Sequence, residues 1–225
     1  MEPSAGIIRF PLFQGIAEGD LPALLACVQA RRQDYPKGAV ILHRGERTTR
    51  FGLVCTGAVH IVKEDFWGDR TILGLAGPGD IFGESYACLG REPLEVSALA
   101  AEDTEVLFLQ AERVVTGCGN ACTFHARLSR NLLALLAGKN LALTRKMGHM
   151  ARRTTREKLL SYLSAQALCA GGAEFDIPLD RQQLADYLAV ERSAMSAALG
   201  KLRDEGILSF RKNHFCLHQR LEFEE

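Results

Sequence analysis

The sequence predicts an α+β chain with a β-rich N-terminal domain, one long helix, and a C-terminal domain of short helices and a hairpin. Three observations carry this prediction. Glycines separate short apolar runs through residues 35–110, a proline-free helical pattern covers residues 124–150, and two helix-capping sequences follow. A chain of 225 residues has room for two modest domains.

Residues 35–110 have the pattern of many short strands. The apolar or alternating runs between the glycines are Ala39–Leu42, Phe51–Cys55, Ala58–Val62, Thr71–Leu75, Val96–Ala100 and Val106–Leu109. Brief strands with frequent turns are typical of an antiparallel barrel or sandwich. Trp67-Gly68-Asp69 fits a hairpin tip, and the apolar spacing from Leu12 to Ala30 predicts a helix that covers the barrel.

A single helix is predicted from Phe124 to Met150, with apolar side chains on two faces. The first face is Leu128, Leu132, Leu135 and Ala142. The second has the 3-4 spacing of a coiled coil and consists of Leu133, Leu136, Asn140, Leu143, Met147 and Met150. Two apolar faces predict two partners, the barrel and a second copy of the chain. The alternative is a buried helix in a monomer.

The long helix is expected to break near Ala151–Arg153. Thr154 and Glu157 have the spacing of a capping box, which begins a new helix that Gly171 ends. The break predicts a hinge and a domain boundary. The predicted organisation is therefore an N-terminal domain with flanking helices over 1–123, a dimerisation helix over 124–150 and a C-terminal domain over 151–225.

Residues 180–217 have the pattern of a winged helix-turn-helix. Asp180 and Gln183 form a second capping box, the turn 189–191 follows, and the next helix runs from Arg192 to about Glu205. A hairpin with the basic tip 211–214 comes after it. Helix, turn, helix and wing form a unit that reads DNA, with a helical hairpin of some other fold as the alternative.

Charge and composition restrict the function classes. The net charge is zero, so a DNA contact must be local, and residues 145–158 carry six basic side chains against one acidic. We see neither a signal peptide nor an apolar stretch of membrane-spanning length, so we expect a soluble, cytoplasmic protein with mainly reduced thiols and no membrane partner.

These motifs together resemble the Crp/Fnr family, named for the cyclic-AMP receptor protein and the fumarate-nitrate reductase regulator. The segments that carry the resemblance are Lys37–Ile41, Gly52–Val59, Gly77–Glu84 and Asp180–Leu208. The resemblance implies an N-terminal double-stranded β-helix, a jelly roll of the cyclic-nucleotide-binding type. It also implies a homodimer along the long helix, a pseudo-palindromic operator in double-stranded DNA, and RNA polymerase as a partner.

Exposed positions at the start of the second helix are expected to face base edges, and these are Glu191, Arg192, Ser193 and Ser196. Arg192 suits guanine, and Glu191 suits the cytosine amino group. The candidates for phosphate contacts are Arg181, Gln182, Lys201, Lys212 and His214. Each could instead be a solvated surface side chain. Ala197 stands where many relatives carry Arg, so we expect a different operator.

The resemblance also implies an effector pocket at Gly83, Glu84, Val96, Ser97 and, from the long helix, Leu141. Relatives that bind cyclic nucleotides carry Arg at the position of Val96, where it neutralises the phosphate. A buried phosphodiester without that partner is unfavourable. We therefore expect no response to cyclic AMP, and the sequence leaves the cofactor or effector unknown. A less charged ligand or a side-chain-filled pocket are the alternatives.

Cysteines suggest a second kind of sensor. Cys118 and Cys122 precede the long helix, and Cys88 comes from the barrel. Thiolates near a helix start are good redox centres or metal ligands, whereas the alternative is that these residues are small buried hydrophobes. Two further hypotheses are a thiol oxidoreductase, which the absence of a Cys-x-x-Cys motif disfavours, and a ligand-binding module that acts through protein contacts alone.

Overall fold

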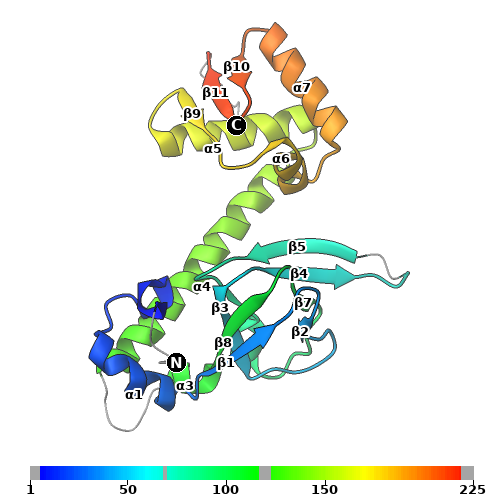
Figure 1. Ribbon diagram of the computed structural model, residues 1–225. Coiled ribbons are helices and arrows are strands. Elements are labelled where there is room, and N and C mark those ends of the chain that lie inside the picture. The colour runs from blue at the N-terminus through cyan, green and yellow to red at the C-terminus, as the bar shows by residue number, and fades with distance from the viewer. Residues whose placement is uncertain (1–5, 68–69, 117–122, 219–225) are drawn as a thin grey trace. The chain divides into compact units, whose positions relative to one another are not determined.

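The computed structural model describes residues 6–67, 70–116 and 123–218 (Figure 1). The chain forms two compact units, Met1–Ala137 and Gly138–Glu225, which divide within the long helix α4 (Thr123–Met150). The sequence prediction places the domain boundary after Met150 instead. The last turns of α4 belong with the C-terminal unit because the buried side chain of His149 packs against the helices that follow.

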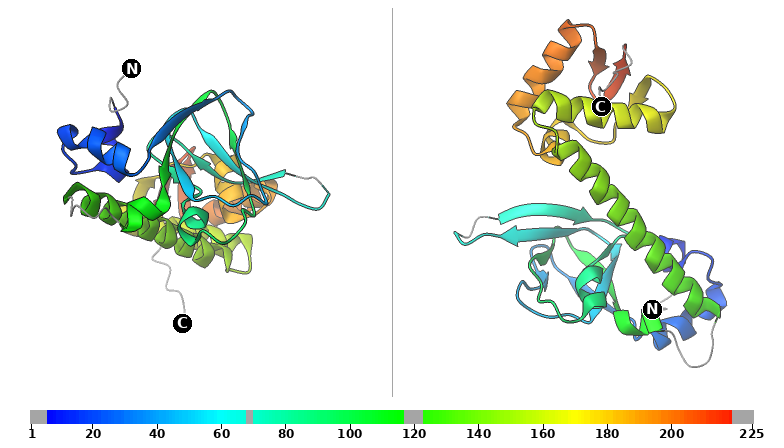
Figure 2. Two further views of the ribbon diagram at one scale, coloured as in Figure 1. Left: turned by 90° about the horizontal axis from the view of Figure 1, so that it is seen from below. Right: turned by 180° about the vertical axis from the view of Figure 1, so that it is seen from behind.

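The N-terminal unit is a β-roll of two antiparallel four-stranded sheets. One sheet has the order β1-β8-β3-β6 and the other β2-β7-β4-β5. The strands are β1 (Arg31–Tyr35), β2 (Val40–Leu42), β3 (Arg50–Thr56), β4 (Val59–Glu64), β5 (Arg70–Ala76), β6 (Ile81–Phe82), β7 (Ser97–Ala100) and β8 (Thr104–Gln110). The jelly-roll prediction is confirmed. The β4–β5 hairpin extends beyond the rest of the roll in both views (Figures 1 and 2).

Short helices pack against this roll, and their bounds correct one prediction. They are η1 (Ile7–Arg9), η2 (Pro11–Phe13), η3 (Glu18–Asp20), α1 (Leu21–Cys27), α2 (Glu84–Leu89) and α3 (Ala111–Thr116). A continuous helix from Leu12 to Ala30 does not form. Gly15 adopts a left-handed backbone with φ of 74°, and Pro22, which lacks a backbone N–H, stands in the first turn of α1, so a continuous helix is interrupted at both places.

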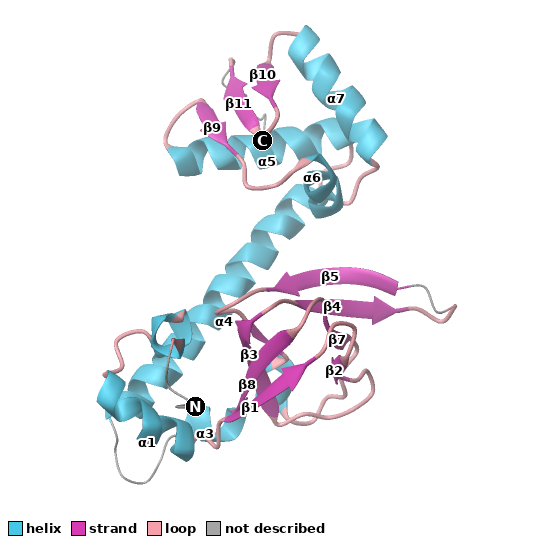
Figure 3. Ribbon diagram, viewed as in Figure 1, coloured by secondary structure: helices cyan, strands magenta, loops and turns pink. Residues whose placement is uncertain are grey.

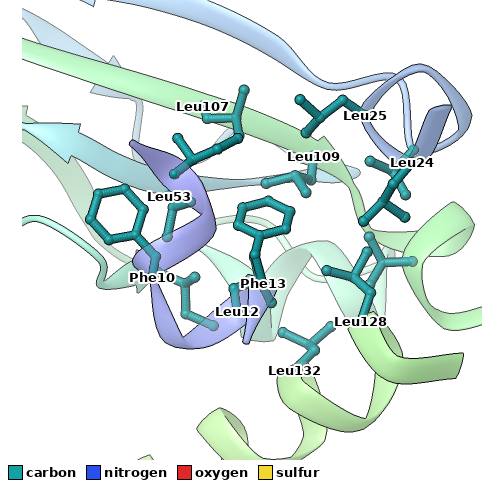
Figure 4. Close-up of a cluster of buried hydrophobic side chains, with 14 of the residues drawn as sticks. Phe10, Leu12, Phe13, Leu24, Leu25, Leu53, Leu107, Leu109, Leu128 and Leu132 are labelled. Carbon is teal, nitrogen blue, oxygen red and sulfur yellow. The ribbon is translucent and has the colours of Figure 1, made fainter. Parts of the chain in front are cut away.

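Apolar side chains of these helices, of the strands and of α4 form one core. Figure 4 shows Phe13, Leu109, Leu128 and Leu132 within it, all of them buried. Leu135 and Leu136 pack at its edge. The barrel-facing stripe of the long helix is therefore confirmed up to Leu135, and this packing anchors the first half of α4 in the sensor unit.

The C-terminal unit is a winged helix-turn-helix built on α5 (Thr155–Ala170), α6 (Arg181–Leu188) and α7 (Arg192–Asp204) (Figure 3). Its antiparallel sheet has the order β10-β11-β9, from β9 (Glu174–Asp176), β10 (Leu208–Arg211) and β11 (His214–Leu217). Both predicted capping boxes form. Strand β9 is absent from the sequence prediction, because three residues with only Phe175 buried give no periodic signal.

His149, at the end of α4, is a buried polar residue of this unit. Its Nδ1 lies 2.8 Å from the Ser161 hydroxyl of α5, and its ring packs edge-on against Tyr162 at 5.7 Å. Tyr187 of α6 lies 6.4 Å away. Burial, and then the positive charge of Arg152, lower the pKa of His149. The neutral ring therefore holds the end of α4 against α5 and α6.

We expect the C-terminal unit to lose stability as the pH falls below 6.5, the ordinary pKa of this side chain. Because folding depresses the pKa of His149, acid favours states in which the ring is protonated in water. Hydrogen exchange of the α5 amides should accelerate in wild type as the pH falls to about 5, after correction for intrinsic rates, and much less in His149→Gln. His218→Gln, at an exposed histidine, is the control. Equal acceleration in wild type and His149→Gln would contradict the assignment.

Candidate nucleic-acid interface and sensor pocket

The turn between α6 and α7 sets the exposed face of α7. Ala189 ends α6 with a left-handed backbone at φ 49°, and Glu191 is the N-cap of α7. Met195, Leu199 and Leu202 are buried as predicted. The remaining positions predicted to contact DNA on this helix are all exposed: Glu191, Arg192, Ser193, Ser196 and Lys201. Arg192, Ser193 and Ser196 thus lie together in the exposed first turns of α7, and Lys201 is exposed two and a half turns after Arg192.

The wing is held in place by Arg181 of α6. Its guanidinium lies 4.8 Å from the ring centroid of Phe210 and 5.0 Å from that of Phe215. Its Nη2 also donates to the carbonyl oxygen of Lys212, at 2.8 Å. Lys212 has a left-handed backbone with φ of 54° and an exposed side chain at the tip. Arg181, predicted as a phosphate contact, is half-buried and positions the wing turn.

His214 of the wing and Gln182 of α6, the other predicted phosphate contacts of these elements, have carboxylate partners within the protein. Both ring nitrogens of His214 face carboxylates, Nε2 at 2.9 Å from Glu174 and Nδ1 at 3.1 Å from Asp176. Hydrogen bonds first to Glu174 and then to Asp176 raise the pKa of His214. Two acceptors favour the imidazolium, which donates from both nitrogens. Gln182 is exposed and donates to Asp186 at 2.9 Å.

Part of the basic segment 145–158 has a structural role inside the C-terminal unit. The Nζ of Lys158 donates to the carbonyl oxygens of Leu188 and Ala189, at 3.3 and 3.4 Å, and so caps the end of α6. The Nζ of Lys146 lies 5.3 Å from the ring centroid of Tyr187. Two of the six basic side chains of this segment therefore have structural contacts within the protein, which explain their presence without a role in DNA binding.

The predicted effector residues of the roll lie on neighbouring elements. Gly83 is the left-handed N-cap of α2, and an added Cβ there would lie 2.9 Å from Leu42. Glu84 follows it and is buried. Val96 precedes β7 and is half-buried, and Ser97 begins that strand. Their placement leaves the apolar Val96 where the resemblance implies a cation.

Ser97 also borders a hollow of about 270 Å³ on the β2-β7-β4-β5 sheet, whose lining includes His43, Arg44, Glu64 and Arg70. The Ser97 hydroxyl accepts from the Arg44 backbone N–H at 3.1 Å. Arg44 Nη1 donates to the Glu64 carbonyl oxygen at 2.5 Å, and Arg70 pairs with the Glu64 carboxylate at 3.0 Å. Gly83, Glu84 and Val96 do not line this hollow.

Leu141 and most of the second stripe of α4 are exposed in the single chain, whereas Leu136 of that stripe is half-buried. Leu133 is 67% exposed, Leu143 60% and Met147 70%, and Leu141 is also exposed. Large apolar side chains in a row along a helix indicate a partner surface. The structure thus leaves uncovered the face that the sequence predicts for a second copy.

Of the three cysteines predicted as a sensor, Cys88 lies within the described residues. Cys118 and Cys122 lie outside the described residues. Cys88, on α2, is exposed, and partial desolvation and the Glu84 carboxylate raise the pKa of its thiol, which disfavours the thiolate. In the ranges 6–67, 70–116 and 123–218, no group of three metal-binding side chains occurs. No helix described there is long and apolar enough to span a membrane.

Comparisons with known proteins match both units. Residues 32–118 match the family model of a cyclic nucleotide-binding domain, and residues 157–225 that of a Crp-like helix-turn-helix domain. The chain is 29% identical over 199 residues to the cyclic AMP receptor protein of Thermus thermophilus, with 88% of each covered. It is 28% identical over 191 residues to the nitrogen fixation regulation protein FixK of Bradyrhizobium diazoefficiens, with 80% of this chain and 74% of that protein covered.

A solved structure with the same fold is the c-di-GMP responsive global regulator CLP of Xanthomonas campestris. It has a TM-score of 0.58 and 21% identity, over 91% of this chain and 100% of that chain. At this identity the likeness concerns the fold alone.

Proposed function

Since the chain belongs to the Crp/Fnr family of DNA-binding transcription regulators, we propose that it acts as a homodimer whose affinity for an operator is set by a signal at the N-terminal roll. Residues 1–123 sense the signal, 124–150 dimerise and 151–225 bind a pseudo-palindromic site. The observation that carries the proposal is the exposed face of α7, with Arg192, Ser193 and Ser196 beside a basic wing.

A second copy of the chain is the partner that best suits α4. The stripe through Leu133, Leu143 and Met147 has coiled-coil spacing, and these side chains are exposed in one chain. Asn140 lies within the same stripe and would set the register of the pair. A two-fold axis along α4 would place two recognition helices in successive major grooves, roughly 34–36 Å apart.

The signal we propose is not cyclic AMP. The relative in Thermus thermophilus is named a cyclic AMP receptor protein, but Val96 offers no charge to a nucleotide phosphate. Titration of wild type with cyclic AMP is expected to give no binding heat, whereas Val96→Arg should bind measurably, since a charge-assisted contact is worth about 1.5–3 kcal/mol. Val96→Leu is the matched control. Tight binding by wild type would refute this assignment.

The test of the function itself is selection of bound sequences from a random DNA library, with and without reductant. A two-fold symmetric motif is expected. A motif that depends on reductant would point to Cys88, Cys118 or Cys122 as the sensor. Failure to enrich any sequence in either condition would favour the alternative, a module that acts through protein contacts. RNA polymerase is the further partner we propose, testable by transcription from a promoter that carries the motif.

A further inference from the structure

A hollow beside the recognition helix is bordered by two positive side chains, one of which pairs with a carboxylate. This alanine hollow has a volume of about 300 Å³ and lies between the start of α5 and α7. Its lining includes Ala194, Ala197, Ala198, Arg156 and Lys201. The alanine side chains are too short to fill it, and the two cations give its rim a positive charge.

The ion-pair partner of Arg156 is the side chain of Glu205. Arg156 Nη2 lies 2.6 Å from Glu205 Oε2, with the two side chains 40% and 46% exposed. The hydrogen bond from Arg156, together with the nearby charge of Lys201, lowers the pKa of Glu205. The carboxylate is thus ionised and paired with Arg156, one of the two cations that line the hollow.

Helix geometry opposes this position of Glu205. The residue is the C-cap of α7, where the negative end of the helix dipole disfavours an acidic side chain. Because the carboxylate is exposed, water competes with Arg156 for hydrogen bonds to it. A phosphate carries a full negative charge and accepts two hydrogen bonds from one guanidinium, so it competes well with such a carboxylate for Arg156.

We assign the contact with a ligand at this hollow to the side-chain cations and not to the backbone N–H groups at the start of α5, because a capping box already occupies that helix end. Glu157 Oε2 accepts from the backbone N–H of Arg153 at 3.1 Å and from that of Thr154 at 3.3 Å. The hollow also adjoins the face of α7 that carries Ser193 and Ser196, so a duplex lying on that face would bring its backbone to the rim.

We propose that the alanine hollow binds a backbone phosphate of duplex DNA through Arg156 and Lys201, and that Glu205 holds Arg156 until the phosphate displaces it. This inference rests on the proposed DNA-binding function and adds a site to it. Glu205 acts as an internal competitor that limits affinity for DNA of any sequence, because a phosphate contact carries no base information.

The test uses the full-length protein and a random-sequence duplex of about 30 base pairs, titrated at several salt concentrations. Glu205→Gln is expected to bind about fivefold more tightly, the effect of removing one charge near a contact in a watery environment. Arg156→Ala should weaken binding and reduce the salt slope by about 0.9 for each phosphate that the variant no longer neutralises. Asp204→Asn makes the same charge change on the neighbouring residue and is the control for Glu205→Gln.

The double variant Arg156→Ala, Glu205→Gln distinguishes competition for Arg156 from the general repulsion between a negative side chain and DNA. If Glu205 competes for Arg156, the gain from Glu205→Gln disappears when Arg156 is absent. An equal gain in both backgrounds, or an equal gain in Asp204→Asn, would overturn the proposal. If wild type binds neither this duplex nor a selected operator, the DNA-binding function itself is refuted. Failure of the phosphate site and failure of the proposed function therefore give different results.

Discussion

Arg192→Ala is expected to remove most of the sequence preference of the protein while leaving its dimer intact. Arg192 is exposed in the first turn of α7, and Glu191 before it is the N-cap. An arginine that forks onto a guanine contributes about 1–3 kcal/mol of discrimination, and a symmetric dimer uses it twice. Competition between the selected operator and a scrambled duplex of equal length measures this loss directly.

The comparison with Lys212→Ala separates base reading from phosphate contact. Lys212 is exposed at the tip of the wing, between β10 and β11 and outside α7. Its loss should weaken binding to operator and scrambled duplex alike and lower the salt slope. If Arg192→Ala also weakens binding to both duplexes equally, Arg192 contacts the DNA backbone. The residues that read bases would then be Glu191, Ser193 and Ser196.

Local sequence signals predicted the DNA-binding unit closely. Capping boxes depend on side chains three residues apart, so Thr154 with Glu157 and Asp180 with Gln183 could be identified without tertiary information. The inward spacing of Met195, Leu199 and Leu202 is likewise a property of one helix. The roll was predictable for the same reason, because short alternating runs between glycines have few other solutions.

Long-range contacts are what the sequence could not provide. Arg181 looks like any exposed basic residue, and only the fold brings it over Phe210 and Phe215. Arg156 and Glu205 are far apart in sequence, so their pairing has no periodic signal. The packing of His149 had no local signal for the same reason, since it depends on helices that follow it.

Leu143→Glu is expected to separate the protein into monomers and, as a consequence, to abolish tight operator binding. The side chain is 60% exposed in the single chain and belongs to the coiled-coil stripe of α4. A carboxylate in a symmetric helix pair would be desolvated opposite its own copy, at a cost of several kcal/mol for each ion. We expect at least about a hundredfold rise in the dissociation constant of the dimer, measured by analytical ultracentrifugation.

Ala142→Glu provides the control, because it adds the same charge to the neighbouring exposed position outside the stripe. It should leave the dimer and the operator affinity nearly unchanged. The two variants also test how the units cooperate. A single α7 reaches one half-site, so a monomer forfeits the second set of contacts and the symmetric spacing together. Should Leu143→Glu remain dimeric, another surface must join the copies, and the uncovered stripe of α4 would then need a different partner.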